Sequence, residues 1–423
     1  MGAKYSAVHC MRSSMKQVTE EIPDRKAAGY RYRHSQWTQL NTSGNSPTPR
    51  SGHDVVVIGN KAYLFGGCGG EQARYGSWTC EIQRRFPDQI TCLNDVYVFD
   101  LELHRWDSVK VKGDAPLPRA SFGMCAGPAP GTLIVAGGTG VEMDSLRSDV
   151  VEYNVPNRTW TRILTDSEET PCKFYGQSVC TYGDNLLLFG GSTGLHYTND
   201  LFEYNVRTNK WKRLVTSGRM PSQRYKHQAV VVGDKMYVIG GGCFKPEQSG
   251  IDLYCLDLRT LVWEETIMKG ELPKARVAHS CSFDAETSTI YLWGGFTSEL
   301  SRLQDFFGFH CPTATWVRMA EEPTQAPAAG GAADHVNAPP ARAFHSAAFY
   351  RGGLYVFSGA NGDVRYSDVW RFQVRTTPPS LSMLVAHKLR SKGGDPFGEM
   401  KTRLPQELVE GVQHMNEHAD RLC

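Results

Sequence analysis

The sequence predicts an all-β fold, a six-bladed β-propeller, from features that recur together along the chain. Apolar runs end in a glycine doublet, a strand-like run beginning at an Asp follows each doublet, and a lone Trp comes next. A "P..R..H"-like segment precedes most doublets. The set returns in one order about every 50 residues, long enough for four strands, which is typical of a propeller blade.

The period and the signals are those of the kelch form of the propeller. A glycine doublet lets strand and turn backbones approach where a side chain would clash. The Trp is expected to fill space between adjacent blades. The doublets are Gly66–Gly67, Gly137–Gly138, Gly190–Gly191, Gly240–Gly241, Gly294–Gly295 and a degenerate Ser358–Gly359. The Trp residues are Trp106, Trp160, Trp211, Trp263 and Trp316.

The sequence also predicts how the propeller closes. The sixth repeat has no Trp after residues 368–374, whereas Trp37 stands upstream of every doublet in the segment 36–40. We therefore expect this N-terminal strand to complete blade six, which leaves no open sheet edge there. Residues 1–34 are then an extension, expected to be disordered, residues 35–376 the propeller, and residues 377–423 a helical tail.

Composition limits the class of protein. A net charge of +2 argues against a nucleic-acid binder. No apolar run reaches the roughly 18 residues of a membrane span. The 12 cysteines form no CxxC pair, so we expect reduced thiols in a cytoplasmic or nuclear protein. Gly2 and Ser6 fit the loose N-myristoylation pattern, although the match can also arise by chance.

One face of the propeller is expected to carry a ring of cations, because the "P..R" loops and the loops after the doublets share it. Such a ring suits a carboxylate or another acidic group, since Arg holds such groups bidentately. The alternative is that each Arg braces a neighbouring loop. Aromatic side chains beside the cations could pack a small apolar residue. The expected substrate-binding residues are Arg50, Arg119, Lys173, Tyr175, Arg224, Tyr225, Arg276, Arg342 and Phe344.

Two insertions are expected on the same face, residues 68–92 and 321–340, either as a lid or rim or as tolerated insertions. The sequence offers no catalytic constellation, metal-ligand spacing or cofactor motif, so we do not expect an enzyme. His residues recur at one repeat position, which predicts packing: His53, His227, His279 and His345. Asp residues recur at the start of strand three and are expected to form turns: Asp95, Asp149, Asp200, Asp252, Asp305 and Asp368.

The tail has helical spacing. Leu381, Leu384, Val385 and Leu389 form one apolar stripe after Ser380, which can cap the helix. A helix of about ten residues is not stable alone in water. It must therefore pack either on the outside of the propeller or in the groove of a partner. A second element follows, with Pro405 placed at a helix start.

The tail resembles the BC box that binds elongin C, with Leu381, Leu384 and Leu389 at the matching positions and Val385 at the small position. Leu404, Pro405 and Leu408 resemble the cullin box that follows it. As a whole the chain resembles the kelch domain-containing protein 10 family, in "KFYGQSV", "LFGGSTGLHYTNDLFEYN", "RYKHQAVVVGDKMYVIGGG" and "PSLSMLVAHKL".

That resemblance implies a substrate receptor of a cullin-RING ubiquitin ligase. Its partners would be elongin B and elongin C, a type-two cullin with its RING subunit, and substrate proteins bound through C-terminal tails that end in Gly or small residues. Arg224 and Arg276 are the first choices for the terminal carboxylate. The alternative is an interaction scaffold without a ligase role, tethered to a membrane through Gly2. A propeller enzyme is a third, more distant reading.

Overall fold

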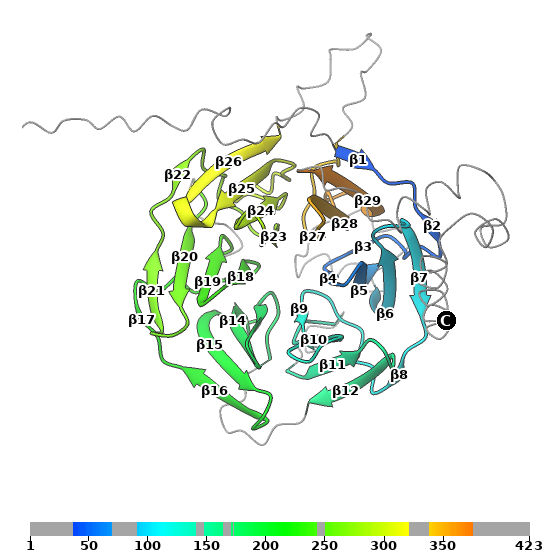
Figure 1. Cartoon of the computed structure of the whole chain (residues 1–423), viewed down its shortest axis with the longest axis horizontal. Helices are drawn as coiled ribbons and strands as arrows, with labels where there is room; N and C mark the ends of the chain where they lie inside the picture. The colour runs from blue at the N-terminus through cyan, green and yellow to red at the C-terminus, as the bar shows by residue number, and fades with distance from the viewer. Residues whose placement is uncertain are drawn as a thin grey trace, which may run out of the picture. The chain divides into compact units, whose positions relative to one another are not determined.

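Six β-sheets are arranged around a central axis (Figure 1). The computed structural model describes residues 37–69, 91–140, 148–163, 171, 173–242, 250–320 and 338–374. Each sheet is one blade, and the innermost strands of neighbouring blades contact one another around the whole circle. The predicted all-β, six-bladed propeller is therefore confirmed.

The blades, numbered in chain order, have the following strands. Blade one contains β3 (Arg50–Ser51), β4 (Asp54–Ile58), β5 (Lys61–Gly69), β6 (Thr91–Asp100) and β7 (Arg105–Val109). Blade two contains β9 (Gly123–Ala126), β10 (Thr132–Ala136), β11 (Val150–Asn154) and β12 (Thr159–Ile163). Blade three contains β13 (Ser178–Tyr182), β14 (Asn185–Ser192), β15 (Tyr197–Asn205) and β16 (Lys210–Leu214).

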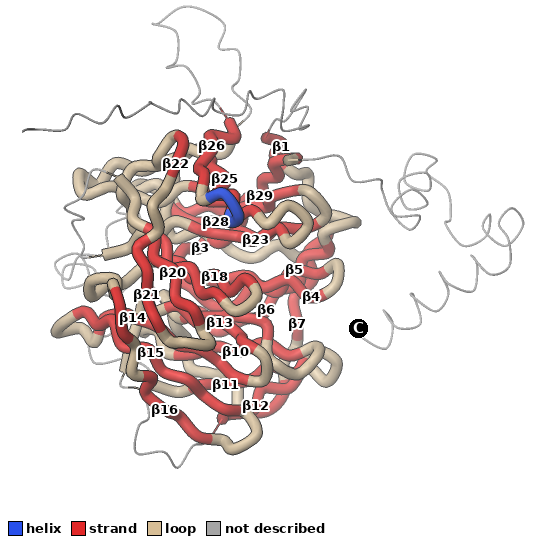
Figure 2. Tube along the Cα trace, turned by 60° about the vertical axis from the view of Figure 1, so that its left-hand side comes forward, coloured by secondary structure: helices blue, strands red, loops and turns tan. Residues whose placement is uncertain are grey.

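The second half repeats this plan. Blade four contains β18 (Gln228–Val232), β19 (Lys235–Ile239), β20 (Leu253–Asp257) and β21 (Val262–Glu265). Blade five contains β23 (Ser280–Asp284), β24 (Thr289–Trp293), β25 (Phe306–His310) and β26 (Thr315–Ala320), with the 3-10 turn η2 (Cys311–Thr313), blue in Figure 2, before β26. Blade six contains β27 (Ser346–Tyr350), β28 (Gly353–Ala360) and β29 (Arg365–Gln373).

The N-terminal strand β1 (Trp37–Gln39) completes blade six, as predicted. It pairs antiparallel with β29, and Trp37 lies opposite Phe372. The Trp37 side chain is buried and its ring centroid is 5.6 Å from that of Trp293 in blade five. Strands from the two ends of the propeller therefore share one sheet and one apolar cluster.

The repeated Trp residues pack between blades, which also confirms the sequence interpretation. Trp160 of blade two lies 5.1 Å, between ring centroids, from Phe65 of blade one. Trp263 of blade four lies 5.3 Å from Phe189 of blade three. Since each apolar cluster combines residues of two adjacent blades, no blade buries its own faces alone.

Four short edge strands were not predicted. They are β2 (Ser43–Gly44), β8 (Lys112–Gly113), β17 (Ser217–Gly218) and β22 (Lys269–Gly270), and each pairs in parallel with the outermost strand of a blade. A Cβ atom on Gly113 would lie 2.3 Å from the Trp160 carbonyl oxygen, so only glycine fits this approach. The chain thus covers the outer edge of a blade before it enters that blade's inner strand.

Some expectations lie outside the described residues. They concern Gly2, the tail residues Leu381, Leu384, Val385, Leu389, Leu404, Pro405 and Leu408, and most of both insertions. Within the described part of the chain, no helix is long and apolar enough to cross a membrane.

Candidate functional site

Five of the predicted ring cations form buried ion pairs inside their own blades. Arg50, Arg119, Arg224, Arg276 and Arg342 are at most 1% exposed. Each guanidinium binds both carboxylate oxygens of one Asp, at 2.5 to 3.0 Å. The partners are Asp95, Asp149, Asp252, Asp305 and Asp368, so these Asp residues are ion-pair partners as well as repeat residues.

The remaining guanidinium N–H groups bind the backbone. In blade five, Arg276 Nη1 donates to the Gly294 carbonyl oxygen at 3.1 Å, and its Nε donates to the Lys274 carbonyl oxygen at 2.9 Å. The other four arginines repeat this pattern. The expected exposed ring of five arginines is therefore wrong, because carboxylates neutralise the side chains and the strands cover them. The alternative reading, that each Arg braces a loop, agrees with the geometry.

Blade three departs from the pattern. Lys173 is exposed and stands one residue before the repeat's arginine position, which is taken by the buried Phe174. Asp200, the aspartate of this blade, pairs instead with the exposed Arg213 on β16. Lys173 therefore does not replace the missing Arg as the partner of Asp200, and its place in a cationic ring stays a prediction.

In each blade, the residue two positions after the arginine position joins one closed circle of backbone hydrogen bonds. We call this circle the mouth ring. Each N–H donates to the carbonyl of the equivalent residue in the preceding blade, at 2.7 to 3.1 Å. All six residues have positive φ angles, between 54° and 68°. The mouth ring consists of Gly52, Ser121, Gly176, Lys226, Ala278 and Phe344.

Lys226 is the one charged side chain of the mouth ring. A Cβ atom on Gly176 would lie 3.4 Å from Lys226 Cδ, so the lysine stem passes over this glycine. Lys226 Nζ donates to Ser121 Oγ in blade two and lies 4.9 Å from the centroid of the Phe344 ring in blade six. Among the described residues, no carboxylate is within ion-pair distance of this ammonium group.

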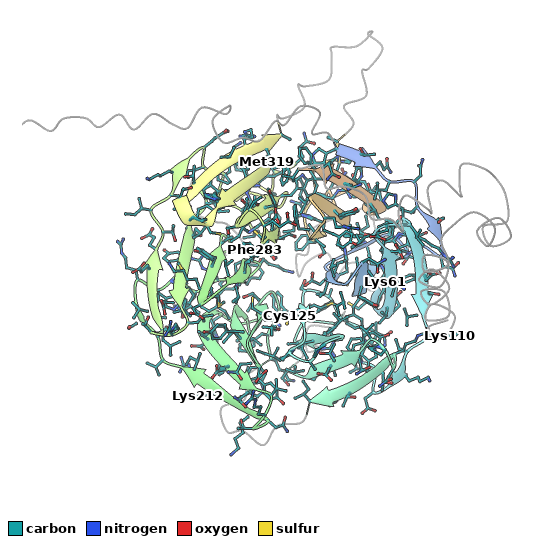
Figure 3. The ribbon with its side chains drawn as sticks, in the orientation of Figure 1. Lys61, Lys110, Cys125, Lys212, Phe283 and Met319 are labelled. Atoms are coloured by element: carbon teal, nitrogen blue, oxygen red, sulfur yellow. The ribbon has the colours of Figure 1, made fainter. Side chains whose placement is uncertain are left out.

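A polar cavity of about 560 Å³ continues inward from the mouth ring, lined by the innermost strands of all six blades. Cys125 and Phe283 face this central space, whereas Lys110 and Lys212 lie at the outer rim (Figure 3). Asp54 lines the cavity and accepts hydrogen bonds from Ser346 Oγ and the Val55 N–H, both at 2.8 Å. The lining of the cavity thus includes a carboxyl group.

Burial shifts the ionisation of both charged groups here. It lowers the pKa of Lys226 to about 7, although the Cys68 thiol and the Asp54 carboxyl act in the opposite direction. It raises the pKa of Asp54 to about 6, against the hydrogen bonds from Ser346 and the backbone. A carboxylate that enters the mouth would favour the charged lysine and the protonated Asp54.

The three predicted aromatic residues stand in the mouth ring or next to it along the chain. Tyr175 and Tyr225 contact each other edge-to-face at 5.9 Å, and Tyr225 stacks on Tyr197 at 4.8 Å. Phe344 packs on Phe296 at 5.6 Å as well as beneath Lys226. Aromatic rings therefore stand in blades three and four and in blades five and six, beside the mouth ring.

The recurring His residues pack between blades, as the sequence predicts. A Cβ on Gly241 would lie 2.5 Å from His227 Cβ, and one on Gly240 would lie 2.9 Å from His279 Cε1. Burial lowers the pKa of His53, His227 and His279 to about 3, so these side chains are neutral at pH 7. The glycine doublets leave the space that the imidazole rings occupy.

The comparisons with known proteins agree with this geometry. The "KLHDC2/KLHL20/DRC7 Kelch-repeats domain" matches residues 82–241 and 226–388, and the "Kelch motif" matches residues 49–110. Kelch domain-containing protein 10 of Homo sapiens is 29% identical over 292 residues, which cover 65% of this chain and 62% of the relative. The Xenopus tropicalis protein of the same name is 27% identical over 66% of this chain and 67% of its own length.

A further relative is the Leucine-zipper-like transcriptional regulator 1 homolog of Drosophila melanogaster, 27% identical over 64% of this chain and 27% of its own length. The chain spans 62% of the length of the human relative. Fold and mouth ring define a propeller of the class that generally acts as a protein-interaction scaffold. The chain belongs to the Kelch-repeat family, and its predicted similarity to the kelch domain-containing protein 10 family is confirmed.

Proposed function

We propose that this protein is a substrate receptor that binds the C-terminal tails of other proteins at the mouth ring. The observation that carries the proposal is Lys226, an ammonium group at the entrance of a polar cavity without a carboxylate partner among the described residues. A substrate's terminal carboxylate supplies the missing charge. Tyr175, Tyr225 and Phe344 then contact the residues that precede the terminus.

The charges at the mouth favour a small anionic group. The five buried arginines are already neutralised, so Lys226 takes the role that the sequence suggested for Arg224 and Arg276. Because the mouth-ring positions nearest the lysine stem are Gly176 and Ser121, backbone of a Gly-ended or small-ended tail can approach it closely. A charge pair of this kind, when desolvated, contributes about 2–5 kcal/mol to affinity as judged by truncation of one partner.

We further propose that the tail delivers the bound protein to a ubiquitin ligase. The resemblance of Leu381, Leu384, Val385 and Leu389 to a BC box supports elongin B and elongin C as partners. The resemblance of Leu404, Pro405 and Leu408 to a cullin box supports a type-two cullin with its RING subunit. The protein itself would perform no chemistry, since transfer belongs to the recruited subunits.

Co-purification tests this delivery role. The full chain, expressed in cells with an affinity tag, should bring down elongin B and elongin C. The double variant Leu381→Asp and Leu389→Asp should lose both, because charged groups replace the apolar stripe. Lys226→Met is the matched control, which should retain both elongins. Absence of elongins from the wild-type sample would leave the alternative, a Kelch interaction scaffold without a ligase role.

A further inference from the structure

Two cysteines of blade one lie directly opposite each other across neighbouring strands. Cys68 on β5 pairs in register with Cys92 on β6, and their Sγ atoms are 2.9 Å apart. Directly opposed residues of an antiparallel pair have Cα atoms about 4.5 to 5.5 Å apart, a separation that a disulfide can span. No disulfide joins them in the structure.

A cation from blade six lies beside this thiol pair. Arg365 Nε donates to Ser51 Oγ at 3.2 Å, and Ser51 is the residue paired with Cys68 on its other side. Within the described residues, Arg365 Nη1 is buried and has no hydrogen-bond acceptor. The Arg365 guanidinium lowers the pKa of the Cys68 thiol, against the larger opposing effects of the Cys92 hydrogen bond and of burial. The site thus holds a spare donor where negative charge on sulfur would develop.

The two cysteines differ in accessibility. Cys68 is buried, and its hydrogen bond with Cys92 together with burial raises the pKa of its thiol. Cys92 is half-buried, so a small oxidant reaches it first. Cys92 Sγ also lies 3.9 Å from the Thr139 carbonyl oxygen. Elsewhere in the described part of the chain, Cys125 bonds Thr181 Oγ1 and Cys180 bonds the Ala229 carbonyl.

We propose that Cys68 and Cys92 form a redox modification site that a peroxide converts into a disulfide between β5 and β6. The Cys92 thiolate attacks the peroxide, the O–O bond breaks, and Cys92 becomes a sulfenic acid while an alcohol or water leaves. The Cys68 sulfur then attacks Cys92 Sγ, the S–O bond breaks, and water leaves as the S–S bond forms. The peroxide accepts the two electrons lost by the sulfurs, and Arg365 stabilises the thiolate.

The proposal is tested by treating the purified full chain with hydrogen peroxide, alkylating the remaining thiols and mapping peptides by mass spectrometry. The expected product is a peptide pair joined through Cys68 and Cys92, lighter by two hydrogens and restored by dithiothreitol. Cys281→Ser, which removes a thiol elsewhere, should leave this product unchanged. Overoxidation of Cys92 without the cross-link, or pairing of Cys92 with any other cysteine, would overturn it.

The role of Arg365 has its own readout. Arg365→Gln should slow formation of the Cys68–Cys92 disulfide about ten-fold at neutral pH while leaving the final product the same. Rates measured from pH 6 to pH 9 should converge at the alkaline end, where the thiolate forms without help. Equal rates for wild type and Arg365→Gln throughout this range would remove Arg365 from the site. A thermal unfolding scan of each variant shows whether its fold is intact.

Discussion

At the scale of single residues, the recurring Arg and Asp positions form ion pairs inside the blades, whereas the mouth-ring position carries the charged Lys226. Recurrence of Arg and Asp could be seen in the sequence, and so could the side of the propeller on which they lie. Their burial could not, because repeat position does not show whether a guanidinium points to solvent or to an Asp in the same blade. Lys226 was overlooked since it replaces Gly, Ser, Ala or Phe at a position that carries no recurring signal.

The buried Arg–Asp pairs are expected to matter for stability. Arg276→Met should lower the free energy of unfolding by about 3–5 kcal/mol, because Asp305 would remain buried without its counter-charge. Arg213→Met, which breaks the exposed pair with Asp200, should cost less than about 1 kcal/mol. Urea unfolding of both variants measures the difference. Similar small losses for the two would show that the buried pair contributes little.

Asp54 predicts a pH-dependent contribution to stability. Its pKa is about 6 in the folded protein and near 3.8 when unfolded, so the folded state holds its proton longer. Stability from this group is present below pH 4 and is lost as pH rises to 6. Lys226 titrates above this window, whereas His53 and His345 titrate across it with opposite sign. The contribution of Asp54 to stability must therefore be isolated by a substitution.

The variant Asp54→Asn provides that isolation. The free energy of unfolding of this variant minus that of wild type should increase by on the order of 1 kcal/mol between pH 4.5 and pH 6.5. Urea unfolding at the two pH values measures it. A difference that is constant with pH, or that shrinks, would contradict the raised pKa of Asp54.

At the scale of elements, the sequence predicted the long strands and the closure but not the short edge strands. Strand periodicity predicts the long strands, and the unpaired Trp37 predicts the closure. The edge strands also have a sequence pattern, because the Gly of a Ser-Gly or Lys-Gly pair stands three residues before a Pro in "SGNSP", "KGDAP", "SGRMP" and "KGELP". Two residues are too short to recognise as strands by alternation, and their partner strand lies in the next repeat.

Gly113 tests the importance of these edge strands. Gly113→Ala should lower the free energy of unfolding by about 1–3 kcal/mol more than Gly233→Ala. Both glycines have positive φ angles, but only Gly113 would bring a Cβ against backbone, since a Cβ on Gly233 meets nothing within 4 Å. Chemical denaturation of the pair measures this. Equal losses would mean that backbone strain, and not the close approach to Trp160, decides the effect.

At the scale of the whole molecule, six repeats place one residue each at the centre, and the repeat that differs there determines the chemistry. Gly52, Gly176 and Ala278 keep the mouth open, Phe344 supplies an apolar surface, and Lys226 supplies charge. The sequence predicts that this face is the binding face. It could not rank the cations on it, because ranking depends on which of them a carboxylate of the chain already binds.

The central claim, that the mouth ring binds a terminal carboxylate, is tested most directly by peptide binding. Fluorescence anisotropy would compare C-terminal peptides ending in Gly, with a free or an amidated terminus, against wild type and Lys226→Met. The free acid should bind wild type at least ten-fold more tightly than the amide, and more tightly at pH 6 than at pH 8.5, as Lys226 loses its proton. Lys226→Met should abolish this preference. Equal binding of acid and amide by wild type would contradict the claim.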